Sequence, residues 1–394
     1  MTSHTAVSRR TFVGGVTTAL GALGLTSPLD LLAQGTQGTP PRPRDQRAPE
    51  EYDTMAKLGN NENPYGPSET VLQAMTKAFK YANRYGYPDG NVLDAIAKHH
   101  DVPTNQVMIA AGSGEILDVC CTALLQDGKK IIGCDPSYEI LYQQASSLKA
   151  GDTIRIPLLA DYRQDIPAMI RATKKNHRQV GFVYLCNPNN PTGRIVTRDE
   201  VRQLLDGIPE DVPVLIDEAY HHFVEDPAYE TSMKYVKEGR AVIVARTFSK
   251  IAGLAGMRLG YAVAPRDQLA VLRPYATGSV NACVRWGAAA ALADKANEDK
   301  VRRVTTELRK KTIADLKTLG YESIPSETNF FMVHLKRPIQ PVIEDFRKKG
   351  VIVGRPFPPL NESLRVSIGT PDEMARFMVA FKEIMPVKAA SSGS

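Results

Sequence analysis

The chain has 394 residues, which is long enough for two domains with substantial hydrophobic cores. Hydrophobic residues make up 43% of it and charged residues 23%, a composition typical of soluble globular proteins. The net charge of +6 includes five arginines between residues 9 and 47, so it does not indicate a nucleic-acid partner. The five cysteines show no metal-binding spacing, and we expect no metal site.

The first 34 residues resemble a twin-arginine export signal. The sequence Ser-Arg-Arg-Thr-Phe-Val at positions 8–13 precedes a weakly apolar run over 14–25 and polar, proline-rich sequence to about Pro49. An apolar run of this length is too short to span a bilayer, so we expect no stable membrane anchor. We expect a signal peptide over 1–34, a linker over 35–49 and a protein that is periplasmic or exported by the twin-arginine route. The alternative is a disordered basic leader on a cytoplasmic protein.

Residues 50–82 are expected to form an N-terminal arm and a helix that join the smaller domain. The stretch Asn60–Pro67 is rich in turn-forming residues. Ser68 can cap a helix that carries Val71 and Met75 on one face, at helical spacing.

Residues 83–280 are expected to form a large α/β domain. Short apolar runs alternate there with helical patterns, which predicts a mostly parallel sheet covered by helices on both faces. A capping box at Thr197 and Glu200 marks the start of one helix. The expected strands are Val107–Ala111, Lys130–Cys134, Gly181–Cys186, Val214–Ile216, Ala241–Ala245 and Gly260–Ala264.

Residues 281–386 are expected to form a smaller α+β domain, followed by a tail over 387–394. A long charged helix, three strands and a last helix follow one another there, a pattern typical of that class. These elements are expected at about Asp294–Leu319, Phe330–His334, Val351–Val353, Leu364–Ile368 and from Pro371.

A lysine and an arginine eight positions apart give the strongest chemical signal in the chain. Lys250 follows an apolar strand, and a strand end aims a nucleophilic amine into a cleft. The hydroxyls of Thr247 and Ser249 and the guanidinium of Arg258 suit a phosphate. A lysine beside a phosphate cradle is what pyridoxal phosphate requires.

Two further segments suit the same cofactor. The Gly-Ser-Gly-Glu sequence at Ser113, Gly114 and Glu115 joins a strand to a helix, whose free backbone N–H groups bind anions. A tight turn explains that segment equally well. Tyr138 follows a strand and can stack on an aromatic ring, although packing in the rim of the core is as plausible.

Polar residues at two other strand ends add to this pattern. Asn190 offers an amide at a carboxyl end, where open α/β sheets bind ligands. Asp217 ends an apolar strand, and a buried carboxylate there needs a partner such as a ring N–H, unless it caps a helix. Tyr220 can bond the phenolic oxygen of the ring.

One arginine suggests how a substrate is held. Arg365 lies in an alternating strand, and a guanidinium that points inward there grips a carboxylate with two donors. If it faces water, it is an ordinary exposed residue. Asn329 can line the same pocket.

In their order along the chain, these motifs resemble fold-type-I pyridoxal phosphate-dependent aminotransferases, most of all the histidinol-phosphate aminotransferase group. The resemblance runs from about Lys57 to Lys382. It rests on Asn-Glu-Asn-Pro-Tyr-Gly, Tyr-Pro-Asp-Gly, Gly-Ser-Gly-Glu, Asn-Asn-Pro-Thr-Gly, Asp-Glu-Ala-Tyr, Thr-Phe-Ser-Lys and Leu-Arg-Val-Ser-Ile-Gly-Thr. It implies an α/β fold with a mostly parallel central sheet in a large domain, a smaller α+β C-terminal domain, and pyridoxal 5'-phosphate as cofactor.

The resemblance also implies roles for single residues. Lys250 would form the Schiff base, Asp217 would pair with the ring nitrogen and Tyr220 would hold the ring oxygen. The other implied cofactor contacts are Ser113, Gly114, Glu115, Tyr138, Asn190, Thr247, Ser249 and Arg258. The implied substrate contacts are Arg365, Arg355, Asn63 and Asn329. The counterpart of Tyr65 reaches the phosphate of a neighbouring subunit, which implies a homodimer.

The implied reaction moves an amino group between an amino acid, or an amine like histidinol phosphate, and a 2-oxo acid. Glu51-Tyr52-Asp53 stands where the family usually carries Tyr-x-Pro-Gly, so the sequence does not identify the substrate. A decarboxylase or lyase on the same scaffold is an alternative. A non-catalytic protein that binds pyridoxal phosphate is another.

Overall fold

The computed structural model describes residues 49–148 and 153–385. The expected signal peptide, nearly all of the expected linker and the expected tail lie outside the described residues. The strands are β1 (Ala56–Leu58), β2 (Val107–Ala110), β3 (Lys130–Asp135), β4 (Thr153–Pro157), β5 (Val180–Cys186), β6 (Val214–Asp217), β7 (Val242–Thr247), β8 (Gly260–Val263), β9 (Ser323–Ile324), β10 (Phe330–His334), β11 (Val351–Val353) and β12 (Ser363–Ser367).

Helices connect most of these strands. The α-helices are α3 (Pro49–Thr54), α4 (Glu69–Ala78), α5 (Val92–His100), α6 (Ser113–Leu124), α7 (Glu139–Ser147), α8 (Ile166–Asn176), α9 (Arg198–Gly207), α10 (Met233–Lys237), α11 (Arg266–Leu272), α12 (Ala282–Ala293), α13 (Lys295–Thr318), α14 (Ile339–Lys348) and α15 (Pro371–Ile384). The 3₁₀ helices are η1 (Phe79–Tyr81), η2 (Thr104–Gln106), η3 (Gln126–Gly128), η4 (His177–Gln179), η5 (His221–Phe223), η6 (Ala255–Met257) and η7 (Arg273–Tyr275).

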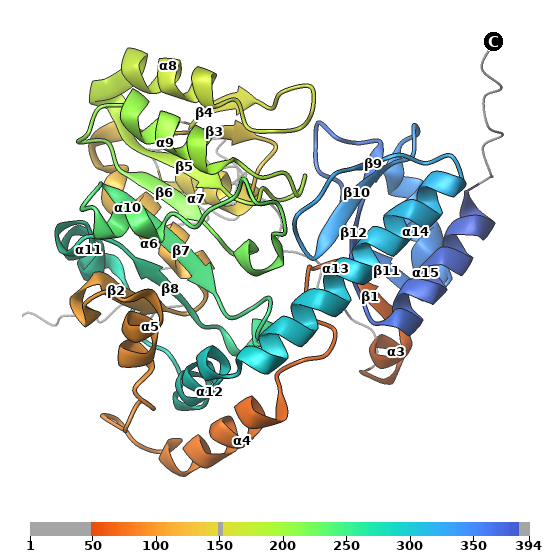
Figure 1. Cartoon of the computed structure of the whole chain (residues 1–394), viewed down its shortest axis with the longest axis horizontal. Helices are drawn as coiled ribbons and strands as arrows, with labels where there is room; N and C mark the ends of the chain where they lie inside the picture. Colours follow the sequence, from red (N-terminus) through yellow and green to blue (C-terminus); the bar gives the residue numbers. More distant parts are fainter. Residues whose placement is uncertain (1–48, 149–152, 386–394) are drawn as a thin grey trace, which may run out of the picture. The chain divides into compact units, whose positions relative to one another are not determined.

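A seven-stranded sheet in the order β2-β8-β7-β6-β5-β3-β4 forms the centre of the larger part of the chain (Figure 1). The pairs between β7 and β4 are all parallel, whereas β8 runs antiparallel to both β7 and β2. This sheet confirms the expected α/β class. The parallel arrangement brings the carboxyl ends of β5, β6 and β7 to one edge, where open α/β sheets bind ligands.

The central strands read as unbroken apolar runs because both faces of the sheet are buried. In β5, Phe182 and Tyr184 belong to one apolar cluster, while Val183 and Leu185 belong to the cluster on the opposite face. Every residue of β5, β6, β7 and β8 is buried. The sheet is therefore a rigid support for the polar residues at its edge.

A second core surrounds two smaller sheets. One is antiparallel in the order β12-β10-β9, and the other pairs β1 with β11 in parallel. Ala56 and Leu58 of the N-terminal arm share their apolar cluster with Phe331 and Phe377 of the C-terminal part. The helix α12 instead packs its Val284 into the cluster of the large sheet, so the change of core follows α12, after the expected boundary at 281.

Several local predictions are confirmed by the side-chain contacts. The side chain of Ser68 caps α4, and Thr197 and Glu200 form the expected capping box of α9. The strands β1, β4 and β9 were not predicted. Among the described residues, we find no helix long and apolar enough to cross a membrane.

Candidate active site

Lys250 lies three residues beyond β7 at the carboxyl edge of the large sheet. Its Nζ donates to the Asn60 carbonyl oxygen at 3.3 Å and lies 5.6 Å from the centre of the Tyr220 ring. Burial, and after it the Arg365 cation, lower the pKa of the amine to about 8, while Glu62 and Asp217 act in the opposite direction. The amine is therefore neutral, and nucleophilic, in a larger fraction of molecules at neutral pH than an ordinary lysine.

Asp217 is the last residue of β6, and its Cα pairs with Ala245 of the neighbouring β7. The residue is 4% exposed, and its Oδ1 accepts from the Ala219 amide at 3.1 Å. Burial raises the pKa of the carboxyl to about 6, although the hydrogen bond from the Ala219 amide and the charge of Lys250 act to lower it. A carboxylate withdrawn from water in this way is stabilised by a cationic N–H donor, and the protonated nitrogen of a pyridine ring fits that need.

Asn190 and Arg365 meet at the same edge, as expected for residues of one site. Arg365 donates to Asn190 Oδ1 at 2.8 Å and to the Gly59 carbonyl oxygen at 2.6 Å. The bond engages the carbonyl side of the Asn190 amide, which leaves its NH₂ group available to a ligand oxygen. Arg365 is 6% exposed and faces inward, so the exposed alternative for it is wrong.

The Tyr220 hydroxyl is held by a residue that the sequence did not single out. Asn61 donates its amide to this hydroxyl at 3.0 Å, and the Ser367 hydroxyl donates to Asn61 Oδ1 at 2.9 Å. Burial raises the pKa of the Tyr220 phenol above its ordinary value, so the hydroxyl stays protonated and can donate to a ring oxygen.

A cradle for an anion lies at the start of α6. Ser113 and Gly114 open this helix, where backbone N–H groups have no partner within the helix. A Cβ built on Gly114 would have no atom within 4 Å, so the helix start faces open space. Gly112 has φ +86°, and a Cβ there would lie 2.2 Å from an Arg258 nitrogen, so only glycine lets the guanidinium approach.

The remaining members of the cradle are bonded to one another. Arg258 donates to Ser249 Oγ at 3.5 Å and to the Ala255 carbonyl oxygen at 2.9 Å. The Thr247 hydroxyl donates to Ser249 Oγ at 2.9 Å. One guanidinium, two hydroxyls and a helix start thus converge, and this donor set suits a phosphate group.

Glu115 and Asn63 have structural partners within the protein. Glu115 accepts from the Ala111 amide at 2.5 Å and from the Thr277 hydroxyl at 2.6 Å. Asn63 donates to the Ile251 carbonyl oxygen at 2.9 Å and accepts from the Tyr65 amide at 3.0 Å. Both side chains therefore brace loops beside the site.

The other expected residues are placed as follows. Tyr138 precedes α7 and packs against the apolar cluster that contains Tyr184, and its neighbour Ser137 donates to Asn189 at 2.8 Å. Asn329 donates to the Asn61 carbonyl oxygen at 3.0 Å. The exposed guanidinium of Arg355 lies 4.3 Å from the centre of the Phe357 ring, and that of Arg365 lies 4.4 Å from it.

A buried ion pair beside the site was not predicted. Arg246 donates to Glu218 at 2.7 Å, and their side chains are 5% and 0% exposed. The Ser232 amide at 2.6 Å and the Thr231 hydroxyl at 2.8 Å complete the shell of the carboxylate. Glu218 directly follows Asp217, the last residue of β6, and Arg246 directly precedes Thr247 in β7. The ion pair therefore braces β6 against β7.

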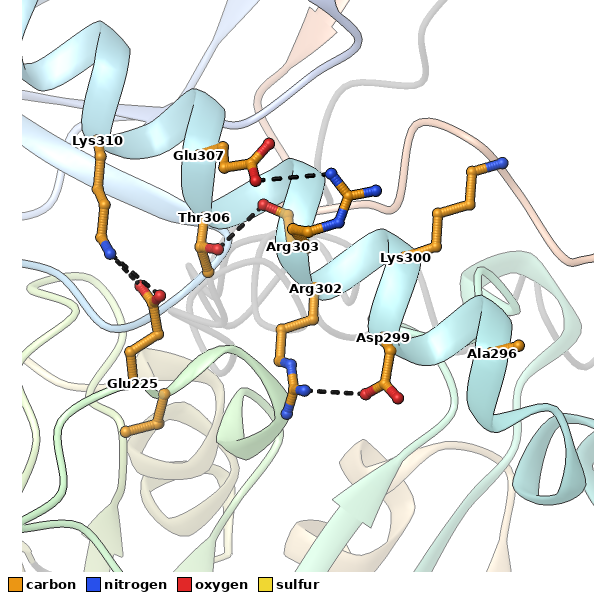
Figure 2. A pocket seen from close by; sticks show the side chains of 10 residues that line it. Glu225, Ala296, Asp299, Lys300, Arg302, Arg303, Thr306, Glu307 and Lys310 are labelled. Atoms are coloured by element: carbon orange, nitrogen blue, oxygen red, sulfur yellow. Dashed lines mark hydrogen bonds and ion pairs between the residues drawn. The ribbon is translucent and has the colours of Figure 1, made fainter.

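A groove of about 880 Å³ lies elsewhere, along α13 and beside Glu225 (Figure 2). Lys310 is paired there with Glu225 at 3.0 Å. Arg302 is paired with Asp299 at 2.9 Å. None of the predicted site residues lines this groove, so its size does not make it the candidate active site.

Comparison with known proteins agrees with this geometry. The family model of class I and II aminotransferases matches residues 53–381. A histidinol-phosphate aminotransferase from Moorella thermoacetica is 37% identical over 341 residues, which cover 84% of this chain and 86% of the relative. One from Akkermansia muciniphila is 35% identical, with coverage of 84% and 90%.

A solved structure shares the fold. The histidinol-phosphate aminotransferase from Sinorhizobium meliloti, crystallised with pyridoxal-5'-phosphate, superimposes with a TM-score of 0.79. The two chains are 24% identical, and the match covers 92% of this chain and 98% of the other.

Proposed function

The chain belongs to the class I and II aminotransferase family and is a pyridoxal phosphate-dependent aminotransferase, and we propose the residues and the substrates through which it acts. The observation that carries the assignment of residues is the meeting of Lys250, Asp217 and Arg365 at one edge of the sheet. The substrates are an α-amino acid, or an amine like histidinol phosphate, and a 2-oxo acid.

Lys250 is proposed as the residue that holds the cofactor and then moves the proton. When bound, pyridoxal phosphate supplies an aldehyde carbon that takes the substrate nitrogen and a ring that takes up negative charge. Displaced by the substrate amine, the Lys250 amine acts as base at the substrate Cα and as acid afterwards. Its lowered pKa, about 8, suits both roles near neutral pH.

Asp217, Tyr220 and Asn190 orient the ring in this proposal. The Asp217 carboxylate keeps the ring nitrogen protonated, and this charge favours the uptake of electrons. Tyr220 and Asn190 donate to the ring oxygen. The Tyr220 oxygen already accepts from Asn61, and Asn190 Oδ1 already accepts from Arg365, so the O–H and N–H groups of the two side chains remain for the ligand. Tyr138 covers one face of the ring.

The cradle at the start of α6 is proposed to bind the cofactor phosphate. Ser113 and Gly114 supply backbone and hydroxyl donors, and Thr247, Ser249 and Arg258 supply the remaining donors. Glu115 contributes indirectly, since it fixes the start of α6 through Ala111.

Arg365 is proposed to grip the substrate carboxylate. Its guanidinium is buried beside Asn190, and two-pronged geometry suits a carboxylate. Arg355 shares the Phe357 ring with it and is proposed to meet a second anionic group of the substrate, such as a phosphate. Asn63 and Asn329 shape this pocket through the loops that they hold.

A spectroscopic screen tests the reaction and its substrates together. The purified enzyme is given single amino acids, including glutamate and histidinol phosphate, and the visible absorbance of the cofactor is followed. We expect loss of the absorbance with a good donor and recovery with 2-oxoglutarate. Lasting loss or release of carbon dioxide would instead indicate a lyase, and no change with any donor would indicate a binding protein.

A homodimer is proposed to complete each site with the partner's Tyr65. In support, Tyr65 is 44% exposed, and Leu72 and Phe79 near it in sequence are 43% and 64% exposed. Large apolar side chains exposed in one region are typical of subunit interfaces. Mixing the inactive variants Tyr65→Ala and Lys250→Ala should restore activity, because a hybrid dimer holds one intact site; no recovery would contradict this.

We further propose that residues 1–34 export the folded enzyme by the twin-arginine route. The Arg9-Arg10 pair supports this, since that route carries proteins folded around a cofactor. In cells, replacing both arginines by lysine should move the enzyme from the periplasm to the cytoplasm. An unchanged distribution would favour a cytoplasmic protein with a basic leader.

A further inference from the structure

A buried arginine lies midway along α13, a helix whose other charged residues are mostly exposed. The side chain of Arg309 is 2% exposed. Its Nη1 donates to the Thr328 carbonyl oxygen, and its Nη2 lies 3.4 Å from Glu225 and 3.8 Å from Glu327. Arginine is rarely buried to this extent without a specific partner.

The partners of Arg309 come from separate parts of the chain. Glu225 follows η5, which begins directly after Tyr220, and Glu327 lies on the loop that leads into β10. The Glu225 amide donates to Glu327 at 2.7 Å, and Lys310 pairs with Glu225 at 3.0 Å (Figure 2). Arg309 thus joins the two loops to α13 through shared carboxylates.

The loop held by Arg309 also contacts the loop that carries Asn190. The Glu327 amide donates to the Gly193 carbonyl oxygen at 2.9 Å. Gly193 has φ +75°, and a Cβ there would lie 2.2 Å from the Ser326 hydroxyl, so the two loops meet without any intervening side chain.

A short series of hydrogen bonds leads from this loop to the active site. Asn329, next to Thr328, donates to the Asn61 carbonyl oxygen at 3.0 Å. Asn61 donates to the Tyr220 hydroxyl at 3.0 Å, and the carbonyl oxygen of Asn60 accepts from Lys250 at 3.3 Å.

We propose that Arg309 is a positioning residue for amino transfer, which holds the Thr328–Asn329 segment so that Asn61 orients Tyr220. Arg309 touches neither Lys250 nor Tyr220 and acts only through these contacts. The inference rests on the ring contacts proposed above for Tyr220.

The test is the variant Arg309→Gln, which removes the cation and shortens the side chain but keeps an amide N–H donor. A displacement on the order of 1 Å at a substrate-facing group lowers turnover by up to about a hundredfold. We therefore expect kcat/KM to fall between about tenfold and a hundredfold, and the visible absorbance of the bound cofactor to titrate at a different pH. Arg309→Lys keeps the charge and should recover part of both properties.

Lys310→Gln is the matched control, because it removes the neighbouring ion pair to the same Glu225. This variant should keep the absorbance titration and kcat/KM of the wild type. If Arg309→Gln does not fold, Glu327→Gln weakens the same anchor with less disturbance, and we expect a smaller change in the same direction.

A double-mutant cycle with Asn329→Ala decides whether the effect passes through that residue. Arg309→Gln and Asn329→Ala should be clearly non-additive in kcat/KM. An unchanged titration in Arg309→Gln, or full additivity, would overturn the inference. Failure of the proposed function would give a different result from failure of this inference, because the variant Lys250→Ala would then keep wild-type turnover.

Discussion

The lowered pKa of Lys250 makes the capture of pyridoxal phosphate depend on pH in a defined way. Only the neutral amine attacks the cofactor aldehyde. With a pKa of about 8, roughly 1% of the Lys250 amines are neutral at pH 6 and about half at pH 8. The rate of capture by the cofactor-free enzyme should rise about tenfold per pH unit up to pH 7 and level off above pH 8.

The cofactor has ionisable groups of its own, so the measurement needs a reference amine. Stopped-flow absorbance would follow the reaction of pyridoxal phosphate with the cofactor-free enzyme and, separately, with Nα-acetyl-lysine. The ratio of the two rates removes the titration of the cofactor. At pH 7 the enzyme amine is neutral in roughly 300-fold more molecules than an amine of pKa 10.5.

Two results would refute this reasoning. A rate ratio that does not change between pH 6 and 10 would show that Lys250 titrates like a free lysine. A plateau that begins only above pH 10 in the enzyme reaction would show the same. The variant Arg365→Met should move the plateau to higher pH, because it removes the cation that disfavours the charged amine.

Three further variants test the surroundings of Lys250. Asp217→Asn should still bind pyridoxal phosphate, yet turn over about a hundredfold more slowly or worse, because the ring loses the charge that keeps its nitrogen protonated; unchanged turnover in a steady-state assay would remove that role. Arg258→Gln should raise the dissociation constant of pyridoxal phosphate by about tenfold to a hundredfold in a fluorescence titration, as expected for a lost charged hydrogen bond of about 1.5–3 kcal/mol; an unchanged constant would place the phosphate elsewhere. Glu218→Gln should lower the free energy of unfolding by about 3 kcal/mol in urea, since Arg246 stays buried without its counter-charge, and a midpoint equal to that of the wild type would contradict the bracing role.

The large sheet could be predicted because its central strands leave an unmistakable pattern. In β5 and β7 both faces are buried, so every position is apolar or packed and the runs stand out from their surroundings. The strand β4 lies at the sheet edge with no buried residue among its five, and it lacks this signal. The strand β1 has three residues and pairs with a segment nearly 300 positions away, a contact that local sequence does not encode.

The same distinction separates the site residues that were predicted from those that were missed. Asp217 ends a buried strand, and Lys250 and Asn190 lie three and four residues beyond two others, so the sequence places all of them at one edge. Asn61 was missed because its partner Tyr220 lies more than a hundred residues away in the sequence. Arg309 was missed because nothing in the sequence distinguishes its position in a charged helix. Glu115 follows the start of a helix, but only its bond to Thr277 shows that it has a bracing role.

The central claim is that pyridoxal phosphate is attached to Lys250. The most direct measurement is reduction of the cofactor-loaded enzyme with borohydride, followed by proteolysis and mass spectrometry of the peptides. We expect the pyridoxyl group on the peptide that contains Lys250, and on no other lysine in stoichiometric amount. A label on a different lysine, or none on any, would contradict the account.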